Sequence, residues 1–310
     1  MRKKFRKFLV LALCFLLLTG CASPAEVKPE EKTVTFTDDL GREVTVPFQP
    51  ERTAVLIGSF ADIWHLAGGE MVATANNAWT DFDLNLSEEV VNLGTTSHAS
   101  LEKLLTSDPD FVIASGKTRL NLDWKDTLES AGIPVAYFEV STFEDYLRML
   151  KICTAITGRE ELYEQNGTDI QAQIEKAVSK ADGSKPSVLY LRGSASSVKV
   201  KNSRGSVLGE MLKDLDCVNI ADSDSQLLEE LSLEKIIQAD PEYIFVVRQG
   251  NDPDAIEKSL QNTLLSNPVW SQLTAVKEGR VYYMDPHLYN LKPNSRWGEA
   301  YEKLADILYP

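Results

Sequence analysis

Side chains that can bind a ligand stand directly after several predicted strands of this sequence. Arg192 and Arg248 each follow an apolar run, and Lys117 follows another. Ligands of open α/β sheets bind at the carboxyl ends of the strands. Two guanidinium groups there are suited to a ligand with carboxylate or catecholate oxygens, and ordinary surface salt bridging is the alternative. The candidate ligand-binding residues are Ser59, Phe60, Trp79, His98, Lys117, Arg192, Lys201, Arg248 and Tyr289.

The three histidines differ in their sequence surroundings. His98 precedes a predicted helix, His287 lies in the stretch 286–289, and His65 falls within an apolar run. Neutral imidazole is a good ligand for iron, so His98 and His287 are the candidate metal ligands. A hydrogen bond from His98 to the start of the next helix is the alternative, and His65 is expected in the core or at a helix end.

No pattern in the chain is typical of catalysis. The sequence has no G-x-S-x-G elbow, no P-loop and no G-x-G-x-x-G. Histidine, the commonest acid–base residue, is scarce. We therefore predict no catalytic residues and a binding protein rather than an enzyme, with a surface-tethered α/β hydrolase as the remote alternative.

The tetrapeptide Ser-Leu-Glu-Lys occurs twice, at 100–103 and at 232–235. Each copy is followed, at the same spacing, by Asp-Pro and an apolar run. The Ser is typical of a helix N-cap, and the acids Glu102 and Glu234 fall in the first turn, where the helix dipole favours negative charge. Proline ends each helix, and a buried strand follows. The repeat predicts two lobes built on one plan.

The order of predicted elements indicates an α/β fold. Strands and helices alternate over 33–140 and again over 181–310, which predicts two lobes, each a mostly parallel sheet flanked by helices. The stretch 141–180 has helical periodicity and no strand signal, which predicts one long interdomain helix. Loops are expected at 76–79 and at 286–289.

The first residues are typical of a lipoprotein leader. A basic start and a short apolar run over 1–20 predict a signal peptide, because the run is too short to span a bilayer. It ends in Leu-Thr-Gly-Cys, which resembles a lipobox, so Cys21 is the expected lipidation site. The polar stretch 21–32 is expected to be a flexible tether.

Composition excludes one class of partner and one class of cross-link. The formal net charge is −14, and the leader carries only basic charged residues, so the rest of the chain is more acidic still. Such a chain lacks the basic surface that nucleic acids require. Cys153 and Cys217 are expected to be buried apolar residues rather than a disulfide pair.

The whole chain after the leader resembles the substrate-binding lipoproteins of iron-complex and cobalamin ABC importers. The resemblance is carried by the lipobox, the opening Thr-Phe-Thr-Asp-Asp-Leu-Gly-Arg hairpin, the paired Ser-Leu-Glu-Lys helices and the Gly-Arg-Val-Tyr before the last strand. It implies two α/β lobes joined by one long helix, with the ligand in the cleft between them. It also implies that Glu102 and Glu234 dock against arginines of the two permease subunits.

The resemblance implies an extracytoplasmic, lipid-anchored, monomeric protein with no cofactor of its own. It would capture a ferric complex, a siderophore or haem, and deliver it to a permease dimer with its ATPase; cobalamin is the alternative ligand. His98 lies where haem-binding relatives place an axial ligand, but the sequence has no tyrosine there, which leaves haem open.

Overall fold

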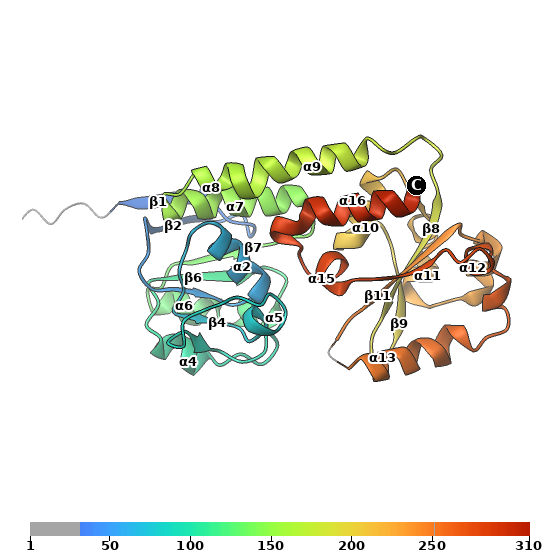
Figure 1. Cartoon of the computed structure of the whole chain (residues 1–310). Coiled ribbons are helices and arrows are strands. Elements are labelled where there is room, and N and C mark those ends of the chain that lie inside the picture. Colours follow the sequence, from blue (N-terminus) through green and yellow to red (C-terminus); the bar gives the residue numbers. More distant parts are fainter. Residues whose placement is uncertain (1–31, 251) are drawn as a thin grey trace, which may run out of the picture. The chain divides into compact units, whose positions relative to one another are not determined.

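The computed structural model describes residues 32–250 and 252–310 (Figure 1). The expected signal peptide, the lipidation site Cys21 and the tether, apart from Lys32, lie outside the described residues. Within the described part of the chain, no helix combines the length and apolarity needed to cross a membrane.

The first lobe contains an antiparallel hairpin and a parallel sheet. The predicted hairpin is formed by β1 (Thr33–Thr37) and β2 (Glu43–Pro47). The five strands of the sheet all run parallel. In sheet order they are β5 (Val91–Asn92), β4 (Ala73–Thr74), β3 (Thr53–Val55), β6 (Phe111–Ser115) and β7 (Val135–Phe138).

Short helices connect these strands. α2 starts at the carboxyl end of β3, and Gly58 is required at its start because a Cβ there would lie 2.6 Å from the backbone of α3. The stretch 76–79, expected as a loop, contributes to α3, and α5 and α6 meet at Trp124. The helices are α2 (Gly58–Leu66), α3 (Asn77–Thr80), α4 (Leu101–Thr106), α5 (Arg119–Asp123) and α6 (Lys125–Ser130).

The strand-free stretch after the first lobe is helical, as predicted, but it is not one helix. α7 (Phe143–Thr157) starts with a capping box and ends at Gly158, whose φ of 69° is left-handed. A second helical run follows through α8 (Glu161–Tyr163), the π-helical η1 (Glu164–Thr168) and α9 (Asp169–Val178). The single long helix expected over 141–180 is therefore corrected to two, because the left-handed glycine turns the chain.

The second lobe is built on another parallel sheet with one antiparallel strand. Its parallel strands are, in sheet order, β10 (Val218–Asn219), β8 (Ser187–Gly193), β11 (Tyr243–Arg248) and β12 (Val281–Met284). β9 (Val198–Lys201) pairs with β8 in the antiparallel direction. The main helices are α10 (Val207–Asp214), α11 (Ser225–Glu229), α12 (Leu233–Ala239), α13 (Pro253–Leu260), α14 (Thr274–Lys277), α15 (Pro286–Tyr289) and α16 (Trp297–Leu308). Short π and 3-10 turns complete the lobe: η2 (Ile220–Asp222), η3 (Gln261–Leu265), η4 (Trp270–Gln272) and η5 (Asn294–Arg296).

The core is divided by the two sheets. One apolar cluster fills the outer face of the first sheet around Leu104 and Tyr137, and another fills a face of the second sheet around Ile236 and Trp270. The largest cluster joins residues of both sheets to α7, α9 and α16, and α16 lies along α9 (Figure 1). Cys153 is buried within it, as expected, whereas Cys217 is only partly buried and packs against it; both thiols are free.

Candidate functional site

Three cationic side chains lie on one face of the β8–β9 hairpin. The antiparallel register places Arg192 opposite Lys199 and Tyr190 opposite Lys201. Side chains opposite each other in a sheet, and those two residues apart on one strand, share a face. Like charges in such positions destabilise a sheet, so folding stability does not account for this arrangement.

The three cations line an open pocket of about 490 Å³ together with Ser194, Ser197 and Gln249. In the described residues, no carboxylate pairs with Arg192, Lys199 or Lys201. Arg192 donates to the Tyr190 hydroxyl at 3.1 Å, while its Nε is buried without a partner. Burial lowers the pKa of Lys201, and the positive charges of Arg192 and Lys199 lower it further. The pocket therefore carries uncompensated positive charge and open donors.

Arg248 does not join this group, although it ends β11 beside β8. Its register partner is Gly193, while that of Arg192 is Val247, so alternation directs the two arginines to opposite faces of the sheet. Arg248 donates to Glu257 Oε2 at 2.9 Å and stacks on the Tyr283 ring at 5.1 Å. The two arginines therefore end neighbouring strands, as expected, but they do not face the same side of the sheet.

Lys199 takes the place expected of Arg248, and sequence reasoning missed it. The signal was present in the alternation Val-Lys-Val-Lys over 198–201, which places Lys199 and Lys201 on one face of a strand. What the sequence does not reveal is that β9 folds back on β8, which brings Arg192 to the same face.

Ser59 and Phe60 lie in the first turn of α2 and are buried. Phe60 packs edge-on against Phe138, with the ring centroids 6.5 Å apart. Trp79 is half-buried on α3 and packs against the core. Of these three expected contacts, Ser59 and Phe60 are core side chains, because the first turn of α2 is buried.

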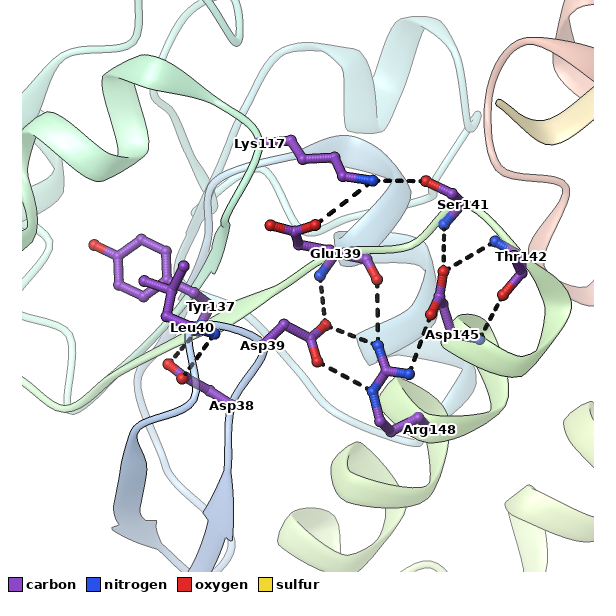
Figure 2. Close-up of polar contacts among 10 residues, drawn as sticks. All are labelled: Asp38, Asp39, Leu40, Lys117, Tyr137, Glu139, Ser141, Thr142, Asp145 and Arg148. Carbon is purple, nitrogen blue, oxygen red and sulfur yellow. Dashed lines mark hydrogen bonds and ion pairs between the residues drawn. The ribbon is translucent and has the colours of Figure 1, made fainter. Parts of the chain in front are cut away.

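Lys117 is exposed at the carboxyl end of β6. Its Nζ donates to Ser141 Oγ at 2.8 Å and lies 3.6 Å from Glu139 Oε2. Figure 2 shows that Glu139 belongs to a network at the start of α7, in which Arg148 contacts Asp39. This network fixes Lys117 at the sheet end, with its charge partly compensated.

The remaining expected site residues differ in accessibility. His98 is exposed with Nδ1 2.9 Å from Ser97 Oγ, and His287 is exposed with Nδ1 3.0 Å from the Asp81 carbonyl. The described residues contain no cluster of His, Cys, Asp or Glu that could hold a metal ion. His65 is exposed in the last turn of α2, at the helix end as expected.

Tyr289 was expected to contact the ligand from a loop over 286–289. That stretch instead forms α15, and Tyr289 is 3% exposed with its hydroxyl donating to the Ala300 carbonyl. Asp-Pro at 285–286 is a helix start, with Asp285 as the N-cap. Tyr289 therefore packs in the core and gives no ligand surface.

The two Ser-Leu-Glu-Lys copies form matching helix starts, as predicted. Ser100 Oγ accepts from the Lys103 amide at 3.2 Å, and Ser232 Oγ accepts from the Lys235 amide at 3.4 Å. Both acids of the motif are exposed.

The lysine of each motif is held away from its acid. Lys103 Nζ donates to the Asn92 carbonyl at 3.0 Å, and Lys235 Nζ contacts Asp224 Oδ2 at 2.6 Å. Across the described ranges, neither Glu102 nor Glu234 has an ion-pair partner. The first turns of α4 and α12 thus each present an unneutralised carboxylate to solvent.

Residues 54–288 match the sequence profile of a family described as Periplasmic binding protein. The ABC transporter substrate-binding lipoprotein YvrC of Bacillus subtilis (strain 168), itself uncharacterized, is 25% identical over all of this chain and 98% of its own. The Fe(3+)-citrate-binding protein YfmC of the same organism is 29% identical over 89% of this chain and 87% of its own. The structure of Staphylococcus aureus SirA complexed with staphyloferrin B superimposes with a TM-score of 0.68, at 21% identity over 89% of this chain and 97% of SirA.

Proposed function

Because the chain belongs to the periplasmic binding protein family, we propose that it captures a ferric complex outside the cell and delivers it to an ABC permease. The pocket of Arg192, Lys199 and Lys201 carries this proposal, because three uncompensated cations favour an anionic ligand. A relative named as a binding protein for ferric citrate supports the same ligand class.

The ligand class follows from the chemistry of the pocket. Guanidinium and ammonium groups form charge-assisted hydrogen bonds with carboxylate or catecholate oxygens. Both groups occur in ferric chelates that carry net negative charge. A neutral ferric trihydroxamate and cobalamin offer no such charge, so the pocket favours a carboxylate or catecholate chelate over both.

Titration of the purified protein with five probes tests this proposal. Ferric citrate, a ferric catecholate, a ferric trihydroxamate, cobalamin and haemin are added separately while tryptophan fluorescence is recorded. We expect the anionic ferric chelates to bind at least tenfold more tightly than the trihydroxamate or cobalamin. Preferential binding of cobalamin would identify a corrinoid, rather than a ferric complex, as the ligand. A Soret band that appears with haemin and is lost in His98→Ala would identify haem as the ligand.

Delivery is proposed to depend on Glu102 and Glu234. Both carboxylates are exposed and unneutralised at matching helix starts, as a pseudo-symmetric pair of basic docking sites on a permease dimer requires. Charge pairs at such interfaces govern orientation and association rate. Glu102→Ala with Glu234→Ala is expected to keep ligand affinity and to abolish stimulation of the transporter ATPase. Glu160→Ala with Glu302→Ala, a pair of exposed acids elsewhere, is the matched control, and normal stimulation by the first pair would refute docking.

Anchoring is proposed to occur through a lipid on Cys21. The relative YvrC is named as a lipoprotein. Each lipid methylene buried in a membrane contributes about 0.8 kcal/mol, so two or more acyl chains retain a protein there. Cys21→Ser is expected to abolish incorporation of labelled fatty acid and to release the protein from washed membranes. Unchanged labelling of this variant would place the modification elsewhere.

A further inference from the structure

Lys292 is a half-buried lysine that neither the sequence motifs nor the cationic pocket includes. It lies between α15 and the turn η5, and its Nζ is 5.8 Å from the centroid of the Phe60 ring. Apart from this ring, the described residues provide no hydrogen bond or ion pair for its Nζ. An ammonium group removed from water without a counter-charge is costly to the folded protein.

The segment that carries Lys292 is fixed on both sides. Before it, the Tyr289 hydroxyl donates to the Ala300 carbonyl at 2.9 Å. After it, Asn294 Nδ2 donates to the Ser59 carbonyl at 2.9 Å and to Asp62 Oδ2 at 2.8 Å. The segment that carries Lys292 is therefore held against the start of α2.

The positive charge of a second lysine, Lys117, affects the pKa of Lys292. Burial and, to a smaller extent, the positive charge of Lys117 together lower the pKa of Lys292 to about 8. The acidic groups on the adjacent elements are Asp62 of α2, which accepts from Asn294, Asp285 at the start of α15, and Glu139, which pairs with Lys117. The other basic groups there are His65, His287 and Arg296, of which Arg296 pairs with Glu299. None of these carboxylates forms an ion pair with Lys292 in the described residues, so its ammonium group has no direct counter-charge.

These two lysines lie where a ligand of the first lobe is expected. Lys117 follows β6, and Phe60 is in the first turn of the helix that follows β3, so both belong to the carboxyl end of the first sheet. Ligands of open α/β sheets bind at this end. Lys292 comes from the far end of the sequence, and the bonds of Asn294 to α2 bring it there.

We propose that Lys292 binds an anionic oxygen of the transported chelate, in a second cationic site that it forms with Lys117 over the Phe60 ring. This inference rests on the proposed function, and it adds a contact outside the pocket of Arg192, Lys199 and Lys201. The chelate supplies the counter-charge that the protein withholds from Lys292. A ligand with anionic groups on two sides therefore satisfies both cationic sites.

The proposal has a thermodynamic signature. A nearby anion favours the charged form of a lysine, so ligand binding draws a proton onto Lys292 when part of it is neutral. At a pH equal to the pKa half of the group is neutral, so binding at pH 8 takes up as much as about 0.5 proton. A lysine that only packs against Phe60 would give no such uptake.

Calorimetric titration with ferric citrate tests the proposal. The wild type, Lys292→Met, Lys292→Arg and the exposed control Lys151→Met are titrated at pH 8 in two buffers with different ionisation enthalpies. We expect the wild type and Lys151→Met to take up a fraction of a proton. Lys292→Met is expected to lose the uptake and roughly ten- to hundredfold in affinity, as for a hydrogen bond to a charged group. Lys292→Arg should keep more of the affinity than Lys292→Met but lose the uptake, because arginine stays charged.

The outcomes separate this inference from the proposed function. A wild type that binds no anionic ferric chelate would refute both. Tight binding of ferric citrate with unchanged affinity in Lys292→Met would refute the role of Lys292 alone. Proton uptake that persists in Lys292→Arg would assign it to another group and overturn the inference as well.

Discussion

Removal of one lysine from the cationic pocket should stabilise the protein and weaken ligand binding at the same time. Lys199 lies directly opposite Arg192, and no carboxylate among the described residues compensates either charge. Two like charges about 4 Å apart in water repel by about 1 kcal/mol, and the repulsion falls as they separate, so we expect roughly 0.5–1 kcal/mol for this pair. Lys199→Gln removes this repulsion, so the ligand-free protein should unfold roughly 1–2 °C higher for a chain of this length.

The same substitution should lower affinity for ferric citrate. A hydrogen bond to a charged group contributes about 1.5–3 kcal/mol, so the loss is roughly ten- to hundredfold. Thermal unfolding of the ligand-free protein and fluorescence titration, both at pH 7, measure the two effects. The exposed lysine Lys258 on α13 provides the control, because Lys258→Gln should change neither quantity.

Salt distinguishes repulsion from other causes of stabilisation. At 1 M ionic strength the screening length is about 3 Å, so the difference in unfolding temperature should nearly vanish. A fall in both stability and affinity in Lys199→Gln would indicate a structural role for Lys199. An unchanged affinity would refute the assignment of the pocket.

Three further experiments follow from particular residues. The pKa of Lys292 is about 8 in the folded protein, below its ordinary value of 10.5. Between these two pH values the unfolded chain binds more protons than the folded protein, so the free energy of unfolding should rise with pH. Urea unfolding of Lys292→Met should lack this rise, and a rise equal to that of the wild type would contradict the assignment. Gly158 has a φ of 69°, and a Cβ there would lie 2.8 Å from the Phe48 ring. Gly132 has a similar φ of 73°, but a Cβ there would meet no atom within 4 Å. Gly158→Ala should therefore destabilise the protein by more than the roughly 1 kcal/mol expected for Gly132→Ala. Arg248→Met should change ferric citrate affinity by less than about twofold, because a paired arginine on the opposite face contributes nothing to the pocket; a tenfold loss would restore Arg248 to the site.

Local patterns in the sequence predicted the parts of the fold that local physics controls. The fully buried strand β6 and the capped starts of α4 and α12 follow from apolar runs and Ser caps. The break at Gly158 was not predicted, because helical periodicity continues on both sides of it. The turn becomes evident only from the left-handed backbone conformation of this glycine and from the close approach of the Phe48 ring to it.

The composition of the site depends on pairing that a sequence does not state. Arg248 looks like the partner of Arg192 when strand ends alone are considered, but register directs them to different faces. Lys199 and Lys292 were missed because each reaches its site through a long-range contact, the first through β9 and the second through Asn294. The prediction for Tyr289 was wrong for a local reason. The Asp-Pro at 285–286, which is also common in loops, starts a helix, and this helix places Tyr289 in the core.

The distribution of ion pairs argues that the unpaired cations are a property of function. The chain is strongly acidic, and carboxylates pair with Arg248, with Lys117 and with Lys235. Counter-charges are therefore abundant, yet the described structure directs none to Arg192, Lys199, Lys201 or Lys292. The repulsion and desolvation at these groups destabilise the ligand-free protein, and only a ligand that brings negative charge offsets them. A neutral ligand would leave this cost in place, which is why charge, more than size or aromatic surface, should decide what this protein carries.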